Sequence, residues 1–184
     1  MSQAPVNPVL QKLRQPQPPE HLCRLLLTRA LPVTERELLE SVCFLVALPA
    51  WRAQAVQTLD QIGTEQKNRY LSRPPHDPQT LYVLSLDGLR RDDDELLLGL
   101  LTLEALPLQA REKIAARGSA EVLDALLAAT QILLDHPELL DAIQQNPNAR
   151  GFHQAQIQRI RDVYQEQPSE AKPATTAEAP PLPD

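Results

Sequence analysis

The feature that most constrains this chain's fold is the regular alternation of helix-starting residues with leucine-rich segments. Thr34 is followed three positions later by Glu37, a capping box in which each side chain bonds a free backbone N–H of the other residue. Apolar residues then recur at the spacing of one helix face, at Leu38, Leu39, Val42, Cys43, Leu45 and Val46. A helix with one apolar face must pack against other helices, so the pattern predicts an all-α protein built from paired helices.

The same pattern predicts a series of short helices along the chain. We expect them over residues 20–30, 34–48, 49–61, 65–71, 77–86, 92–106, 107–118, 119–133 and 137–145, with a last amphipathic helix around 157–164. Asp92 is expected to cap its helix, and Gly118 to end another in the left-handed conformation. The segment 95–106 is apolar on most of its circumference, which predicts a central helix covered either within the chain or by a second copy of it.

Composition supports helices and disfavours several functions. The chain has only two Phe, three Tyr, one Trp and five Gly, and no segment alternates apolar with polar residues as a strand does. Its net charge of −6 disfavours nucleic-acid binding, which needs a basic surface. Cys23 and Cys43 lie in apolar helical segments, which predicts buried free thiols and a reducing compartment. No apolar run is long enough to span a membrane, and we expect a cytoplasmic protein.

Proline content divides the chain into three parts. Residues 1–19 form a proline-rich N-terminal arm, with one short helix expected around residues 9–14. Residues 20–166 form a single α-helical domain. Residues 167–184 are a tail rich in Pro, Ala and Glu, which we expect to be disordered because it has too little apolar surface to bury.

An internal repeat is visible at an offset of 58 residues. Glu37-Leu38-Leu39 followed by Ala47-Leu48-Pro49 matches Glu95-Leu96-Leu97 followed by Ala105-Leu106-Pro107. The offset also superimposes the predicted caps Thr34 and Asp92. The repeat predicts two related halves, 20–88 and 89–166, in which helical hairpins stack to form a continuous core.

The pattern of residues that start and end these helices resembles that of the HEAT-like and leucine-rich-repeat-variant helical proteins of bacteria. The residues that carry the resemblance are Ala105-Leu106-Pro107, Ala120-Glu121-Val122-Leu123, His136-Pro137-Glu138-Leu139-Leu140 and Asn146-Pro147. The resemblance implies a stacked array that binds other macromolecules on a helical face, and it assigns no functional residue. Because 58 residues exceed the roughly 40–47 of a HEAT unit, a compact multi-helix bundle remains the alternative to a HEAT-like array.

Catalytic, cofactor and metal motifs are absent from the sequence. It has no Gly-x-Ser-x-Gly nucleophile turn, no glycine-rich phosphate loop and no Cys-x-x-Cys. The four histidines are scattered, and the acidic run at residues 92–95 suits a helix N-terminus better than a metal site. We therefore expect no enzyme, no cofactor and no metal. An unrecognised enzyme whose active site assembles only in space stays open as the least favoured reading.

Trp51 and the basic residues near it form the candidate contact surface. An exposed tryptophan is a typical anchor of protein interfaces, although a lone tryptophan is more often a core or boundary residue. The basic residues are Arg52, Lys67, Arg69, Arg73, Arg90 and Arg91. Together they would suit an acidic segment of another protein, and solvated surface charge is the alternative interpretation. The sequence thus favours a non-catalytic scaffold or adaptor for a protein partner, with a nucleic-acid-binding helical repeat protein as the alternative; a homo-oligomer stays open.

Overall fold

The computed structural model describes residues 8–166, and within them the protein is all-helical. This part of the chain contains twelve α-helices and no strand. The helices are α1 (Pro8–Leu13), α2 (Glu20–Leu27), α3 (Glu35–Ala47), α4 (Arg52–Asp60), α5 (Thr64–Leu71), α6 (Pro78–Arg91), α7 (Asp94–Leu101), α8 (Leu108–Arg117), α9 (Ala120–Ala128), α10 (Thr130–Asp135), α11 (Glu138–Gln145) and α12 (Gly151–Glu166).

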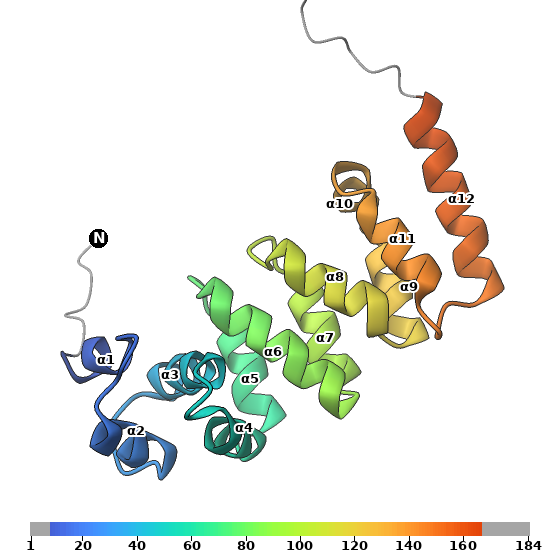
Figure 1. The fold of residues 1–184 in the computed structure, drawn as a ribbon. Coiled ribbons are helices and arrows are strands. Elements are labelled where there is room, and N and C mark those ends of the chain that lie inside the picture. The colour runs from blue at the N-terminus through green and yellow to red at the C-terminus, as the bar shows by residue number, and fades with distance from the viewer. Residues whose placement is uncertain (1–7, 167–184) are drawn as a thin grey trace, which may run out of the picture.

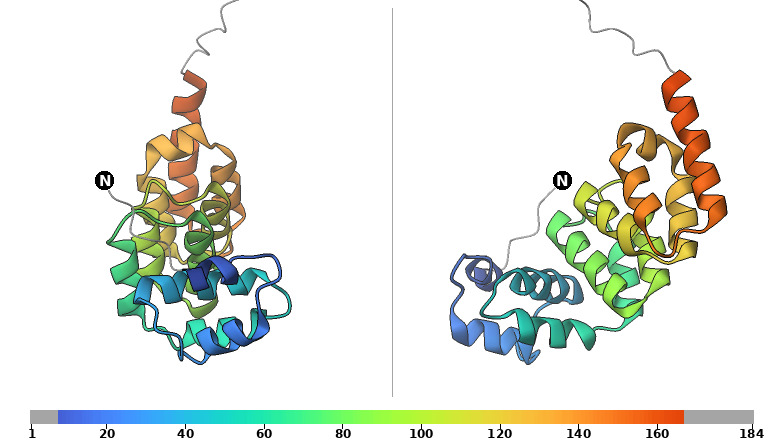
Figure 2. Two further views of the ribbon diagram at one scale, coloured as in Figure 1. Left: turned by 90° about the vertical axis from the view of Figure 1, so that its left-hand side faces the viewer. Right: turned by 45° about the vertical axis from the view of Figure 1, so that its right-hand side comes forward.

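The helices follow one another along an arc, with α1 and α12 at its opposite ends (Figures 1 and 2). Near one end α3 packs against both α4 and α6; in the middle α6 packs against α7 and α8; beyond that α8 packs against α11. The approach of α6 to α7 is close at Gly88, where an added Cβ would lie 2.8 Å from Cδ2 of Leu97. A larger residue there would force the buried side chain of Leu97 to shift, so glycine suits this close approach.

Buried side chains form two hydrophobic clusters that meet in α8 and α9. The first runs from Leu10 to Val122, and the second from Ala115 to Ile160. The neighbouring residues Ile114 and Ala115, both fully buried, belong to different clusters. The apolar helix α7 lies between α5, α6 and α9 and contributes to the first cluster. Val122 and Leu123 of α9 are divided between the clusters in the same way, so the packing divides within α8 and α9, beyond the boundary at 88/89 suggested by the repeat.

Capping residues start the helices largely where the sequence predicts. The Thr34–Glu37 capping box is present, and Asp77 accepts a hydrogen bond from the backbone N–H of Thr80. The prediction for Asp92 is wrong by one residue. Asp93 caps α7 by accepting from the N–H of Leu96, whereas Asp92 ends α6 in the left-handed region (φ 52°), which Asp tolerates better than most residues.

Other local predictions also differ from the structure. The helix expected over 92–106 ends at Leu101, as α7. Gly118 ends α8 with φ −62° and ψ 159°, so it is not left-handed. It is required by space instead, because an added Cβ would lie 2.7 Å from the carbonyl oxygen of Ile114. The helix expected over 119–133 is broken at Ala129 (φ −82°, ψ 58°) into α9 and α10. No proline or glycine marks this break in the sequence.

The N-terminal segment contains the expected short helix. Leu10 and Leu13 of α1 are buried in the first cluster, so this part of the arm belongs to the folded unit. Cys23 and Cys43 are both buried free thiols, and burial raises the pKa of each. Among the described residues no helix is long and apolar enough to cross a membrane. The predicted disordered tail, 167–184, lies outside the described residues.

Candidate interaction groove

An apolar groove of about 420 Å³ lies between α4 and α6, over the C-terminal end of α3. Val46 and Ala47 of α3 lie at one end of it, and the lining from α4 includes Val56 and Leu59. The lining residues from α6 are Gln79, Tyr82, Val83, Leu86, Asp87 and Arg90. Both α4 and α6 pack against α3, so the groove lies between two helices that share one packing partner.

The residues that line each wall of the groove recur at the spacing of one helix face. Gln79, Tyr82, Val83, Leu86, Asp87 and Arg90 of α6 follow i, i+3, i+4, i+7, i+8 and i+11. Arg52, Val56 and Leu59 of α4 follow i, i+4 and i+7. A continuous stripe of each helix therefore faces the groove, with polar residues at the ends of the α6 stripe and apolar or aromatic residues between them.

A buried ion-pair network closes one end of the groove. Lys67 of α5 is fully buried, and its Nζ lies 2.7 Å from Oδ2 of Asp87. Asp87 also accepts from Arg90 at 2.6 Å, and Arg90 bonds Asp60 at the end of α4. The hydrogen bond from Arg90 holds the pKa of Asp60 below its usual value. The carboxylate inside the groove is thus neutralised by two cations, which offsets the cost of burying its charge.

Arg52 is the cation at the opposite end. It is exposed, and its Nε donates to the backbone carbonyl of Val46 at 3.1 Å. This contact satisfies a free carbonyl at the C-terminus of α3, where a cation is also favoured by the helix dipole. Among the described residues no carboxylate lies within ion-pair distance of Arg52. Its guanidinium therefore carries an uncompensated positive charge beside an apolar surface.

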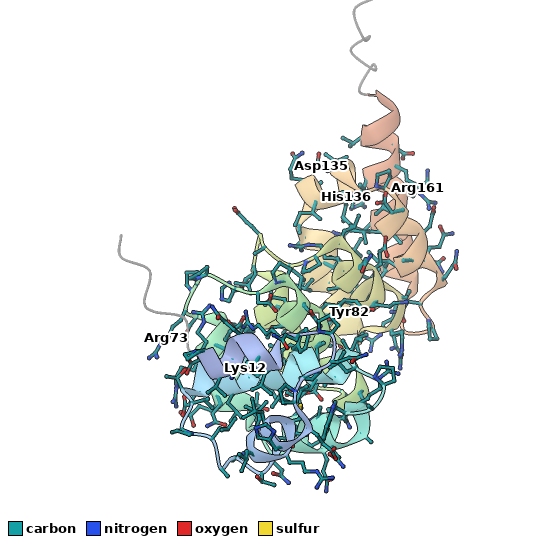
Figure 3. The ribbon with its side chains drawn as sticks, turned by 60° about the vertical axis from the view of Figure 1, so that its left-hand side comes forward. Lys12, Arg73, Tyr82, Asp135, His136 and Arg161 are labelled. Carbon is teal, nitrogen blue, oxygen red and sulfur yellow. The ribbon has the colours of Figure 1, made fainter. Side chains whose placement is uncertain are left out.

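The structure divides the seven candidate contact residues between separate places. Arg52 and Arg90 line the groove, whereas Arg69 and Arg73 line a smaller pocket of about 120 Å³ with Glu35, Arg36, Gln66 and Tyr70. The two pockets lie at opposite ends of α3, because Glu35 and Val46 are 11 residues, or roughly 16 Å, apart on that helix. Figure 3 likewise shows Arg73 and the groove residue Tyr82 on well-separated parts of the molecule.

Trp51 and Arg91 do not line the groove. Trp51 is half-buried against the first hydrophobic cluster and precedes α4 as its N-terminal cap residue. Arg91 is exposed at the end of α6. Lys67, grouped with these bases by sequence proximity, is fully buried in its ion pair with Asp87. The structure therefore does not assemble these residues into one surface.

Much of the basic charge is already paired with carboxylates. Arg69 lies 3.0 Å from Glu35 and 2.8 Å from Glu65, and Arg90 is shared between Asp60 and Asp87. A surface that binds nucleic acid needs cations free to neutralise phosphates. These pairings reduce the charge available for that role.

The small pocket at the other end of α3 is built around a tyrosine. Arg36 donates to the backbone carbonyls of Arg73 and Pro75, and its guanidinium lies 5.4 Å from the ring centre of Tyr70. The Tyr70 hydroxyl accepts from the N–H of Asp77 at 3.0 Å. Burial raises the pKa of Tyr70 to about 12. These contacts fix the proline-rich connection between α5 and α6, which is a structural role.

Apart from Gln79 and Asp87, the groove residues that sequence reasoning missed are apolar or aromatic. Val46, Val56, Tyr82 and Leu86 are half-buried members of ordinary helix stripes. Their signal in the sequence is weak, because a stripe that faces a groove has the same spacing as one that faces the core. Tyr82 is the exception: a tyrosine within an apolar stripe is typical of a boundary that reaches water.

The histidines and acidic residues do not converge on a reactive centre. Within residues 8–166 no group of three or more His, Cys, Asp and Glu side chains is placed to hold a metal ion. The buried His153 accepts from the N–H of Arg150 through Nδ1, so its Nε2 carries the hydrogen and donates to Asp124 at 3.0 Å. This bond fixes the start of α12.

Comparison of the chain with protein-family models, with curated proteins and with solved structures finds no match in any of the three.

Proposed function

We propose that this protein is a non-catalytic scaffold or adaptor that binds a segment of a protein partner in the groove between α4 and α6. The observation that carries the proposal is the groove itself, which exposes apolar stripes of two helices side by side. A concave apolar site with a few polar groups is the usual form of a binding site. The buried free thiols Cys23 and Cys43 are consistent with action in the cytoplasm.

The groove suits a peptide segment better than a small reactive substrate. The charged groups in its lining, Arg52, Asp87 and Arg90, are each bonded to protein atoms. General acid–base chemistry requires a group whose proton is available to a substrate. An apolar surface with charged ends instead resembles a groove that receives an apolar protein segment.

The test compares partner capture by the full chain and by a variant with a blocked groove. Ala47→Arg places a long charged side chain at an exposed position of the lining, and Ala155→Arg on α12 is the matched control. Each tagged protein is isolated from its native cell, and the co-purifying proteins are quantified by mass spectrometry. We expect a stoichiometric partner whose recovery falls about tenfold with Ala47→Arg and is unchanged with Ala155→Arg.

A fourth sample lacks residues 167–184. Loss of the partner from this sample alone would place the contact in the tail and overturn the groove proposal. Recovery of nucleic acid, with no protein that depends on Ala47, would favour the alternative of a nucleic-acid-binding helical protein. Recovery of a second copy of this chain, lost with Ala47→Arg, would show that the groove forms a homo-oligomer.

A further inference from the structure

We infer that the groove receives a short amphipathic helix, and that a carboxylate on this helix pairs with Arg52. The inference rests on the proposed function and specifies the shape and charge of the partner segment. It follows from the dimensions of the groove, from the polar groups that line it, and from the state of its two arginines.

The groove has the length of a short helix. Its lining on α6 runs from Gln79 to Arg90, which is 11 residues or about 16 Å. This equals about three helical turns. Stripes on α4 and α6 flank it on two sides, so an inserted helix would touch both with residues at i, i+4 and i+7.

The lining also selects a helix over an extended segment. Gln79 and Tyr82 are the uncharged side chains of the lining with a donor or acceptor, and Val46, Val56, Leu59, Val83 and Leu86 present none to an incoming backbone. The backbone N–H and C=O groups of α4 and α6 are already bonded within those helices. An extended segment would leave its own backbone groups unpaired on this surface, whereas a helix satisfies them internally.

The charges at the ends of the groove determine which sign of charge is preferred on the partner segment. Arg90 is shared between Asp60 and Asp87, and Asp87 also pairs with Lys67. Arg52 bonds only a backbone carbonyl through Nε, which leaves its terminal nitrogens as the donors that face a partner. A carboxylate is the planar acceptor that a guanidinium binds best. A partner helix with Asp or Glu at that end is therefore favoured, and one with Lys or Arg is disfavoured.

The test is a selection of displayed random peptides of about 16 residues, long enough for four helical turns. The bait is the full chain in four forms: unchanged, Ala47→Arg, Arg52→Glu and Arg91→Glu. Arg91→Glu is the matched control, because Arg91 is an exposed arginine outside the groove lining. Thermal unfolding of each form is measured first, and Arg52→Gln replaces Arg52→Glu if the latter does not fold.

With the unchanged chain we expect enriched peptides that lack proline, carry apolar residues at i, i+4 and i+7, and contain Asp or Glu at one end. Their binding should be lost with Ala47→Arg. Arg52→Glu should reverse the preference from acidic to basic peptides by at least about tenfold, and Arg52→Gln should remove it. Arg91→Glu should leave the preference as it is.

Three outcomes overturn the inference: enriched peptides that are proline-rich or extended, an acidic preference that does not respond to Arg52, or no peptide that depends on Ala47. Failure of the proposed function is recognised separately, by native partner capture that Ala47→Arg leaves unchanged. If capture depends on Ala47 but the peptides are not helical, the groove is a binding site and only the helix inference fails.

Discussion

The helix pair α4–α6 and the pair α8–α11 have corresponding positions in the internal repeat, yet they pack differently. From α3 onward the order of helices matches the order from α7 onward, with α10 as the additional element. In the second region α8 packs directly against α11. In the first region α4 and α6 each pack against α3 and face one another across the groove. Similar helix order thus produces one closed pair and one open pair.

One arginine near the start of the second helix makes the same kind of bond in both regions. Arg52 donates to the carbonyl of Val46, and Arg111 donates to the carbonyl of Leu103 at 2.7 Å. Arg111 is only 5% exposed, and burial lowers its pKa, whereas Arg52 is exposed. The bond to the preceding helix end is therefore local, and the surrounding packing decides whether the guanidinium remains available to a partner.

The buried polar groups also differ. The open region holds a charged pair, Lys67 and Asp87, directly behind the groove. The closed region holds the neutral side chain of Asn146, which donates to the carbonyls of Ala115 and Gly118 at 2.9 and 3.1 Å. The open region thus buries an ion pair beside its groove, whereas the buried polar groups of the closed region, Asn146 and Arg111, bond backbone carbonyls.

The most damaging change to the open region should be Lys67→Met. It leaves the buried Asp87 carboxylate with only Arg90, and removal of one partner of a buried ion pair costs about 3–5 kcal/mol. Urea unfolding of the variant measures the free energy of unfolding. The double variant Lys67→Met with Asp87→Leu should recover most of the loss, and a single-variant loss below about 1 kcal/mol would show that the pair does not maintain this region.

In the closed region the matching test is Asn146→Ala. The substitution leaves the buried carbonyl of Ala115 without its donor, removes one of the two donors to the carbonyl of Gly118, and should lower the free energy of unfolding by about 2 kcal/mol. Partner capture should be unaffected, because Asn146 does not line the groove. Thermal and urea unfolding measure the first effect, and affinity capture the second. A loss of capture at full stability would contradict the assignment of binding to the open region alone.

A third prediction concerns the connection between α5 and α6, which takes the place of α10. Tyr70 packs beside it with a pKa raised to about 12, above the value near 10 of an unfolded chain. Its contribution to stability is complete below pH 10 and is lost as the pH rises toward 12. Between these values the unchanged protein should lose about 1–2 kcal/mol more than Tyr70→Phe. Equal losses in both proteins, measured by unfolding at each pH, would contradict the burial of this hydroxyl.

The smallest expected change in stability comes from filling the groove. Ala47→Leu adds an apolar side chain to the lining of the open region, which makes it more like the closed one. The free energy of unfolding should change by less than about 0.5 kcal/mol, because Ala47 is exposed and has room. Partner capture should fall about tenfold, and Ala155→Leu should leave it unchanged. Normal capture with Ala47→Leu would locate the binding site elsewhere.

Local sequence signals predict most of the helices. They predict the packing between helices less well. The cap at Thr34 and the apolar stripe after it place α3 correctly, since both depend on residues within one or two turns. The break at Ala129 had no local signal, and Gly118 is required by the carbonyl of Ile114 instead of by its own dihedral angles. The all-helical fold was therefore predictable, while breaks set by contacts were not.

The candidate site was predictable only in part. Arg52 and Arg90 lie in the groove, but Arg69 and Arg73 lie at the other end of α3. Sequence proximity does not show which charges are already paired, and Lys67 is the clearest case, since it is buried with Asp87. Whether α4 contacts α6 depends on packing between segments far apart in the chain. The periodicity of apolar residues does not predict this packing.

The division of the hydrophobic clusters inside α8 and α9 has a consequence for how the protein opens. Ile114 and Ala115 anchor α8 in both clusters, and Val122 and Leu123 do the same for α9, so opening either region exposes one side of each helix. Such shared helices couple the two regions, and their backbones open only when both regions have opened. In native-state hydrogen exchange, the amides of α8 and α9 should then be the last to exchange, and α1 and α12, at the two ends of the arc, should exchange first.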